Sequence, residues 1–453
     1  MTSAEPHTPA LAAGSGSGAP RRSLLLAGGG MRVAYQAGVL AALERAGILF
    51  AHGDGTSGGT MNLAMLLSGL SPAQIGERWR TLDVRGFVSL WPLRRLLAGP
   101  PYPALGSSTG IRDRVFPHLG IAPERIRAAQ GIAGTFNVCD FESKRCVAIP
   151  HDQIDLDLLV AGVSLPMLSP AVRRQDRAYV DAVWITDANV AEAVGRGADE
   201  LWLVWAIGNH GVYRNGAFQQ YVHMIEMSAN GSLFRELDAV RALNASRPEP
   251  IRLHVIRPRS PLPLDPDFFL GRIDASTLVA MGHRDACRYL ASPAPQGVAL
   301  DSAATRMEDP RPGVAFRETL RAHDGAWSVR LSWEIEDLER FAADGTGSLV
   351  GDISHPHLGE RVLACDGSFR RRGRRWDGEL RLPDGRLVFT RSQRHWPTVD
   401  ASLLDSAGGE VAAGALAVTG RPAWQTVHAR GVGSMTEGAA AVTRFTRLAV
   451  LGG

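Results

Sequence analysis

A serine flanked by small residues is the first feature of the chain that could carry chemistry. It stands in the stretch Gly55-Thr56-Ser57-Gly58-Gly59. A nucleophilic serine in a sharp strand-to-helix turn needs small residues two positions before and after it, because the strained backbone lifts the hydroxyl clear of the sheet. The apolar run that follows predicts a helix, whose N-terminal dipole favours negative charge developing at the turn. Ser57 is therefore a candidate nucleophile for acyl transfer, and an ordinary Gly/Ser turn is the alternative.

A second glycine-rich turn precedes the serine. Gly28, Gly29 and Gly30 follow an apolar run and are continued by Met31-Arg32. Consecutive glycines let backbone N–H groups approach an oxyanion closely, so these three are candidates for an oxyanion hole, with Arg32 fixing the loop or adding positive potential. A dinucleotide fingerprint would need another glycine one position later, and a P-loop would need a Gly-Lys-Ser/Thr ending; neither is present. A purely structural glycine turn remains the alternative.

A serine nucleophile also needs a base. Asp181 ends the short run Tyr179-Val180, so it could point into a site built from loops. Held close to the serine and partly desolvated, such a carboxylate can accept the hydroxyl proton without a histidine. A solvated loop aspartate is the competing interpretation. His52, five residues before Ser57, is a second candidate base.

Alternating apolar runs and helical periodicities predict the elements that position these residues. Only one helix and one short strand fit between Gly30 and Ser57, so the serine turn comes too early for an ordinary α/β-hydrolase. The near-continuous apolar runs are typical of strands covered on both faces. The pattern therefore predicts a layered α/β domain. The expected strands are 24–27, 48–50, 132–139, 201–207 and 251–256, and the expected helices are 34–46, 61–70 and one beginning at Ser71-Pro72.

The remainder of the chain has a different pattern. Residues 1–22 are expected to form a disordered leader, residues 23–292 the α/β domain, and residues 293–312 a linker rich in Pro, Ala, Ser and Asp. Residues 313–453 contain short alternating strands and the hairpin turn Pro383-Asp384-Gly385. This spacing predicts an antiparallel β barrel or sandwich.

Composition limits the class of protein. The chain has 453 residues, with 49 Lys+Arg against 46 Asp+Glu, and this balance excludes a dedicated nucleic-acid binder. The four cysteines show no CxxC spacing, so neither a disulfide framework nor a zinc site is expected. We expect free thiols in a reducing compartment. No apolar run is long enough to span a bilayer and the first residues lack a secretion signal. We therefore expect a cytoplasmic protein that associates at most peripherally with a membrane.

The chain resembles the patatin-like phospholipase family along most of residues 23–292. Gly28–Arg32 looks like that family's oxyanion motif, Gly55–Gly59 looks like its nucleophile elbow, and Asp181 falls where its Asp-Gly motif supplies the second member of a Ser-Asp dyad. Supporting similarity comes from the segments 164–170 and 281–286. The resemblance implies a three-layer α/β/α domain and hydrolysis of lipid esters. The mechanism requires no metal or organic cofactor.

Two departures from the family pattern leave a second hypothesis open. Val33 and Ala182 stand where the family usually has glycine. The alternative is therefore a catalytically weakened lipid-binding or scaffold protein. The tail weakly resembles a β-rich module found with cholesterol-oxidase-type proteins, and the basic stretch Arg370–Arg375 suggests contact with an anionic membrane, against a solvated hairpin turn. The sequence makes no prediction of lipid head group, acyl length or oligomeric state.

Overall fold

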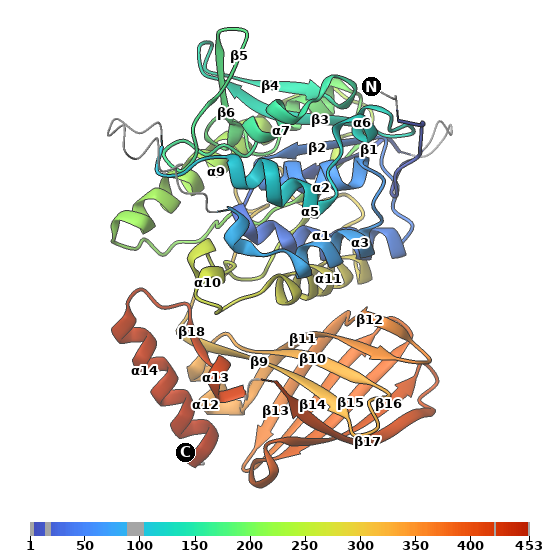
Figure 1. The fold of residues 1–453 in the computed structure, drawn as a ribbon, viewed down its shortest axis with the longest axis vertical. Coiled ribbons are helices and arrows are strands. Elements are labelled where there is room, and N and C mark those ends of the chain that lie inside the picture. Colours follow the sequence, from blue (N-terminus) through green and yellow to red (C-terminus); the bar gives the residue numbers. More distant parts are fainter. Residues whose placement is uncertain (1–3, 14–19, 88–103, 421–422, 452–453) are drawn as a thin grey trace.

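The chain folds into two units that pack against each other. The computed structural model describes residues 4–13, 20–87, 104–420 and 423–451. A layered α/β unit precedes a β barrel, and a long helix near the C-terminus lies beside the barrel (Figure 1). Both fold classes predicted from the sequence are confirmed, and the β-rich part is a barrel, not a sandwich.

The first unit is built on an eight-stranded mixed sheet with the order β5-β6-β3-β2-β1-β7-β8, in which β4 pairs with β3. Its central strands β1, β2, β7 and β8 are parallel, so their carboxyl ends meet at one edge of the sheet. The loop after β1 and the turn after β2 are therefore neighbours. The strands are β1 (Arg22–Leu26), β2 (His52–Thr56), β3 (Ala133–Asp140), β4 (Arg145–Pro150), β5 (Val172–Arg174), β6 (Arg177–Asp181), β7 (Glu200–Val204) and β8 (Arg252–Ile256).

Helices cover both faces of this sheet. Successive side chains of β1 point to opposite faces. Leu24 and Leu26 pack into the core shared with α1, α2, α3 and α11, whereas Leu25 packs into the core shared with α8 and α9. The result is the expected three-layer α/β/α arrangement, with α1, α3 and α11 on the side of the barrel (Figure 1). The helices are α1 (Ala34–Arg45), α2 (Gly58–Leu67), α3 (Pro72–Thr81), α5 (Phe116–Leu119), α6 (Pro123–Arg127), α7 (Leu156–Ala161), α8 (Val190–Gly195), α9 (Ala217–Asn244), α10 (Asp265–Phe269) and α11 (Ala275–Ala291).

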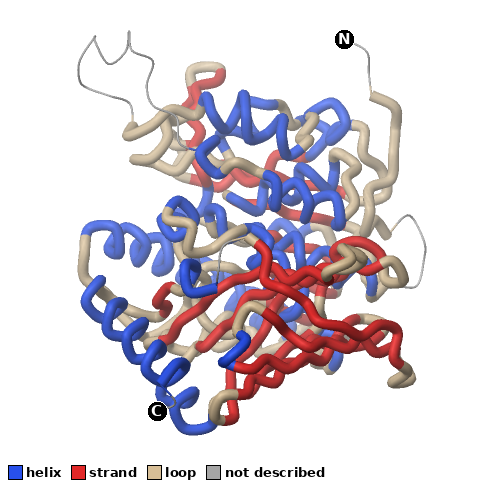
Figure 2. Tube along the Cα trace, turned by 60° about the horizontal axis from the view of Figure 1, so that its bottom comes forward, coloured by secondary structure: helices blue, strands red, loops and turns tan. Residues whose placement is uncertain are grey.

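The second unit is a closed antiparallel barrel. Strands β9, β10, β11 and β13 to β17 pair in sequence, and the pairing of β17 with β9 closes the barrel. Two short strands extend it, since β12 pairs with β11 and β18 pairs with β9. Figure 2 shows the strands wrapping around the barrel with α14 along one side. The elements are β9 (Gly313–Ala322), β10 (Ser328–Ile335), α12 (Leu338–Asp344), β11 (Thr346–His355), β12 (Gly359–Leu363), β13 (Asp366–Arg372), β14 (Arg375–Leu382), β15 (Gly385–Ser392), β16 (Thr398–Asp405), β17 (Glu410–Thr419), α13 (Ala423–Thr426), β18 (His428–Arg430) and α14 (Met435–Thr446).

Aromatic side chains fill the interior of the barrel. Trp333 packs against Phe316, Phe369 and Trp376, with ring centroids 5.4, 4.9 and 5.8 Å away. Because these side chains are buried, this part of the barrel interior is a packed core. The expected two-residue hairpin joins β14 to β15, where Leu382 pairs with Gly385.

Two boundary predictions need comment. Residues 4–13 belong to the expected disordered leader, yet His7 and Ala12 form β-bridges with Ala129 and Phe50, and Leu11 is buried. The prediction of disorder is wrong for this segment, because Leu11 packs against the first unit. Residues 1–3 and 14–19 lie outside the described residues. The expected linker 293–312 contains no helix or strand.

The barrel contacts the first unit mainly through α11. Arg288 of α11 donates to Asp366 at the start of β13, with N–O distances of 3.0 and 2.6 Å, and Arg361 contacts Glu77 at 2.7 Å. Val350 of the barrel is buried in the core of the first unit. Among the helices in the described ranges, none combines the length and apolar character needed to cross a bilayer.

Candidate active site

Ser57 occupies a strained turn between β2 and α2. Its φ of 52° and ψ of −127° are unusual for a residue with a side chain, and such a conformation costs about 1–3 kcal/mol. The turn closes because Gly59 has no side chain: a Cβ there would lie 1.9 Å from the carbonyl oxygen of Leu26. The helix α2 begins at Gly58, three residues earlier than the apolar pattern indicated, so its N-terminus points directly at Ser57.

Asp181 lies at the end of β6 and is fully buried. Its backbone N–H donates to the carbonyl of Ser164 at 3.0 Å, and its Oδ1 accepts from the N–H of Val183 at 2.9 Å. The Ser57 side chain is close enough to act on this carboxylate as a hydrogen-bond donor. The contact is looser than ideal geometry, since Oδ2 of Asp181 is buried without a well-formed hydrogen bond. Ser57 and Asp181 are therefore neighbours at the ends of β2 and β6, and their pairing as a dyad remains a proposal.

Burial sets the ionisation of this carboxyl group. Desolvation raises the pKa of Asp181 to about 7, although the hydrogen bonds from Ser57 and from the Val183 N–H act in the opposite direction. A carboxylate with a pKa near neutrality is half ionised at pH 7 and holds a proton more strongly than an exposed aspartate. Both properties suit a general base that later returns the proton.

The glycine loop passes directly over Ser57. Gly29 and Gly30 have φ values of 153° and 60°, and both line the pocket that Ser57 faces. Their N–H groups have no acceptor among the described residues. Gly28 differs, because its N–H donates to Oδ1 of Asp187 at 2.9 Å. Of the three expected oxyanion donors, Gly28 is therefore engaged elsewhere, and Gly29 and Gly30 are free.

Two aspartates that the sequence did not reveal hold this loop. Asp187 accepts from Gly28 at one end, and Asp265 accepts from the N–H of Met31 at 3.0 Å at the other. Asp187 is fully buried and Asp265 is partly buried, and desolvation raises the pKa of each. Arg32 donates from Nε to the carbonyl of Gly29 at 3.0 Å. It therefore fixes the loop, which is one of the two roles expected of it. Asp265 lies far along the chain and no spacing pattern points to it.

His52 lies at the opposite end of β2 from Ser57. Its Nδ1 is 3.1 Å from the Ser23 hydroxyl and its Nε2 is 2.9 Å from the Thr135 hydroxyl. Burial, with charge repulsion from Arg196 and His151, lowers its pKa to about 3. His52 is therefore a neutral structural histidine, and the hypothesis that it is the base is wrong.

An apolar pocket of about 390 Å³ opens in front of Ser57. It is large enough for a small ligand or part of a lipid chain. Ser57 lines it and Asp181 does not. Its apolar walls come from segments far apart in the sequence: Met61, Phe87, Leu105, Ile111, Val163, Leu165, Leu168, Val183, Ile207, Phe218, Tyr221, Val222, Ile225, Leu264, Pro266 and Phe269.

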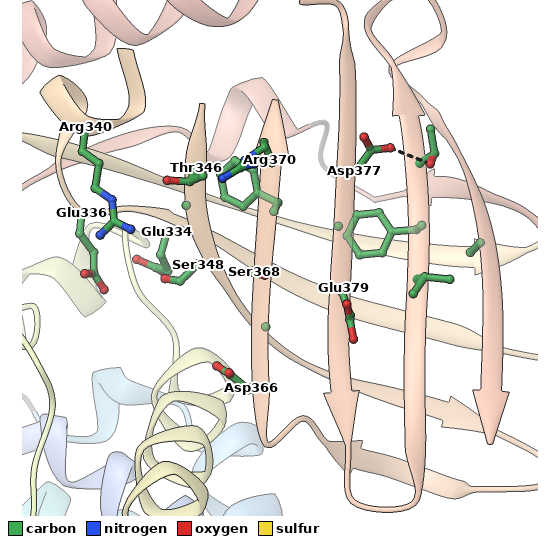
Figure 3. Close-up of a pocket in the computed structure, with 18 of the residues that line it drawn as sticks. Glu334, Glu336, Arg340, Thr346, Ser348, Asp366, Ser368, Arg370, Asp377 and Glu379 are labelled. Atoms are coloured by element: carbon green, nitrogen blue, oxygen red, sulfur yellow. Dashed lines mark hydrogen bonds between the residues drawn. The ribbon is translucent and has the colours of Figure 1, made fainter. Parts of the chain in front are cut away.

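A larger pocket of about 1300 Å³ is lined by strands β10, β11 and β13 to β17 of the barrel together with residues of α11 and the linker, and it has a different character. Figure 3 shows polar side chains along its strands, including Asp366, Asp377 and Glu379. Asp366 is paired with arginines, and Asp377 accepts from the Thr390 hydroxyl at 3.0 Å. The polar groups of the barrel pocket therefore pair with one another. The apolar pocket contains Ser57, and for this reason it is the candidate active site.

The two departures from the family pattern are accommodated locally. Ala182 begins a 3-10 turn (Ala182–Trp184) and does not have a positive φ, so alanine carries no conformational strain there. Val33 is fully buried at the start of α1, and its carbonyl accepts from the Asn62 amide at 2.9 Å. Neither side chain displaces Ser57 or Asp181.

Comparison with known proteins assigns part of the chain to a family. Residues 24–194 match the family model described as patatin-like phospholipase. No curated protein matches the chain. The solved structure of the type III effector protein ExoU is 12% identical to this chain, with 63% of this chain and 78% of that chain covered and a TM-score of 0.18. Residues 24–194, which contain Ser57 and Asp181, therefore form a patatin-like phospholipase domain.

Proposed function

We propose that the protein is a serine lipid acyl hydrolase in which Ser57 and Asp181 form a catalytic dyad. The observation that carries the proposal is a serine in a strained turn that lines an apolar pocket and lies near enough to the buried Asp181 carboxylate to lower its pKa. The family match supports lipid hydrolysis in general.

In the first step the Ser57 oxygen attacks the acyl carbonyl carbon while Asp181 accepts the hydroxyl proton. The carbonyl oxygen becomes an oxyanion. The N–H groups of Gly29 and Gly30 line the pocket without an internal acceptor, so they are the donors for this oxyanion, assisted by the N-terminus of α2. One such donor is worth about 3–4 kcal/mol in the transition state.

In the second step the tetrahedral intermediate collapses. The bond from carbon to the alcohol oxygen breaks, and protonated Asp181 returns its proton to the leaving alcohol. Water then attacks the acyl-serine with Asp181 again as base, releasing the fatty acid and regenerating the Ser57 hydroxyl. A pKa near 7 fits both directions of this proton transfer.

The rim of the pocket supports peripheral association with a lipid surface. Leu105, Leu168, Phe218 and Phe269 all line the pocket, yet they are exposed by 70%, 41%, 46% and 46%. Exposed apolar side chains grouped around one opening are typical of a surface that meets another apolar phase. This rim is on the α/β unit, whereas the arginine-rich stretch 370–375 is on the barrel, where Arg371 lies over the Phe341 ring and Arg375 pairs with Asp377.

The weakened scaffold alternative rests on Val33 and Ala182, and neither removes a group that the mechanism uses. Hydrolysis of a panel of fatty-acid esters and phospholipids distinguishes the two. We expect the wild type to release fatty acid and Ser57→Ala to lose all activity. Ser68→Ala, which changes a buried serine at the other end of α2, should keep it. Equal activity in wild type and Ser57→Ala would refute the proposal.

A further inference from the structure

Three metal-ligating side chains meet where α11 packs against the barrel. His283 and Cys287 are four residues apart on α11 and therefore share one face of the helix. Cys365 comes from the short connection between β12 and β13. One donor atom of each lies within 4.8 Å of the other two. The cysteine spacing gave no sign of this cluster, because only the docking of the two units assembles it.

A backbone carbonyl fixes the tautomer of His283 so that one ring nitrogen is free to bind a metal. Its ring is buried and its Nδ1 lies 3.1 Å from the carbonyl oxygen of Ala364. A carbonyl oxygen can only accept, so Nδ1 carries the proton and Nε2 keeps a free lone pair. Histidine ligands commonly donate their other N–H to a carbonyl in this way, which fixes the tautomer and the ring.

The spacing of the donor atoms is close to that of a metal centre. The Cys287 sulfur lies 3.7 Å from Nδ1 and 3.9 Å from Nε2 of His283. Bond lengths of about 2.3 Å to sulfur and 2.0 Å to nitrogen place tetrahedral ligands about 3.6 to 3.8 Å apart. The widest separation in the cluster would therefore have to shorten by about 1 Å. Both cysteines are partly exposed, so solvent can fill a fourth position.

The charged side chains around the three ligands are paired with one another and not with the cluster. Arg288 and Arg381 are paired with Asp366, and Arg45 is paired with Asp384. Two thiolates would balance a divalent cation, and thiolate with imidazole selects zinc-like ions over magnesium or calcium. A disulfide between the cysteines would use only two of the three donors and gives no role to the oriented histidine.

We propose that His283, Cys287 and Cys365 bind a zinc-class cation that ties the α/β unit to the barrel. The ligands come from both units, so the cation binds only the docked arrangement and stabilises it by mass action. This inference is independent of the proposed hydrolase activity.

The test measures zinc on the full chain, purified under reducing conditions without chelator. We expect close to one zinc per chain and a rise in Tm on adding Zn²⁺ to chelated protein. Cys365→Ser, and separately Cys287→Ser, should weaken Zn²⁺ binding by at least about 100-fold and abolish the Tm rise. Cys146→Ser is the matched control, because Cys146 is also partly buried but lies outside the cluster.

Two results would overturn the proposal. One is Zn²⁺ binding that is absent, or that all three variants retain equally. The other is a Cys287–Cys365 disulfide, seen as an intact mass lower by two hydrogens with no metal bound under any condition.

Discussion

The ionisation of Asp181 makes the pH dependence of hydrolysis a sharp prediction. The proposed base works only as the carboxylate. Burial raises its pKa to about 7, the value that governs the free enzyme and therefore kcat/KM. We expect kcat/KM to rise with pH through neutrality and to level off above about pH 8.

The expected magnitude follows from this pKa. About one tenth of the Asp181 population is ionised at pH 6 and about nine tenths at pH 8, so kcat/KM should increase roughly tenfold between them. An exposed aspartate with a pKa near 4 would be ionised throughout this range and would give a flat profile. The same shift has the opposite effect on stability. Because the folded pKa lies above the unfolded one, the stabilising contribution of protonated Asp181 is lost as pH rises from about 4 to 7.

The assay follows release of fatty acid by chromatography, so that no titrating chromophore distorts the profile. Glu236→Gln is a control, because burial raises the pKa of Glu236 to about 6 although it does not line the pocket. This variant should keep the wild-type profile, whereas Asp181→Asn should lower kcat by about 10²–10⁴-fold. A flat profile between pH 6 and 8, or an unchanged profile in Asp181→Asn, would refute the assignment of the base.

Three further substitutions test the packing around the site and in the barrel. Asp187→Ala leaves the Gly28 N–H buried without an acceptor, so we expect the free energy of unfolding to fall by about 1–3 kcal/mol and kcat to fall as well. Asp187→Asn keeps an acceptor oxygen and should lose less of both, as measured by denaturant unfolding and by kinetics. Gly59→Ala places a Cβ 1.9 Å from a backbone oxygen, so it should lower the free energy of unfolding by about 1–3 kcal/mol and remove most of the activity. Gly231 on α9 has open space around it, and Gly231→Ala should lower neither the stability nor the activity. Glu318→Ala leaves the fully buried Arg391 without its charge partner, so it should destabilise the barrel by about 3–5 kcal/mol in thermal unfolding. Equal stability of this variant and the wild type would contradict the buried ion pair.

Local patterns predicted the helices around the site, but they placed the strand before Ser57 at 48–50, whereas β2 spans His52–Thr56. The Ser71-Pro72 start of α3 carries its own capping information, and the structure shows the reciprocal bonds between Ser71 and Gln74. The serine turn was predictable for a similar reason, because small residues at fixed positions are required by its backbone. These features depend on neighbours in sequence.

Contacts between distant segments were not predictable from spacing. Asp187 and Asp265 hold the glycine loop only because the chain returns to it from two different elements, and a single sequence gives no sign of either contact. The order of residues 4–13 was missed because its composition resembles a flexible leader, whereas the burial of Leu11 depends on the domain surface that it meets.

The central claim is that the Ser57 hydroxyl is an activated nucleophile, and covalent labelling with a fluorophosphonate tests it most directly. The reagent should modify the wild-type chain at Ser57, as located by peptide mass spectrometry, and should label Asp181→Asn far more slowly. Ser57→Ala should take up none. A wild-type chain that resists the reagent, or a label found on another serine, would contradict the account.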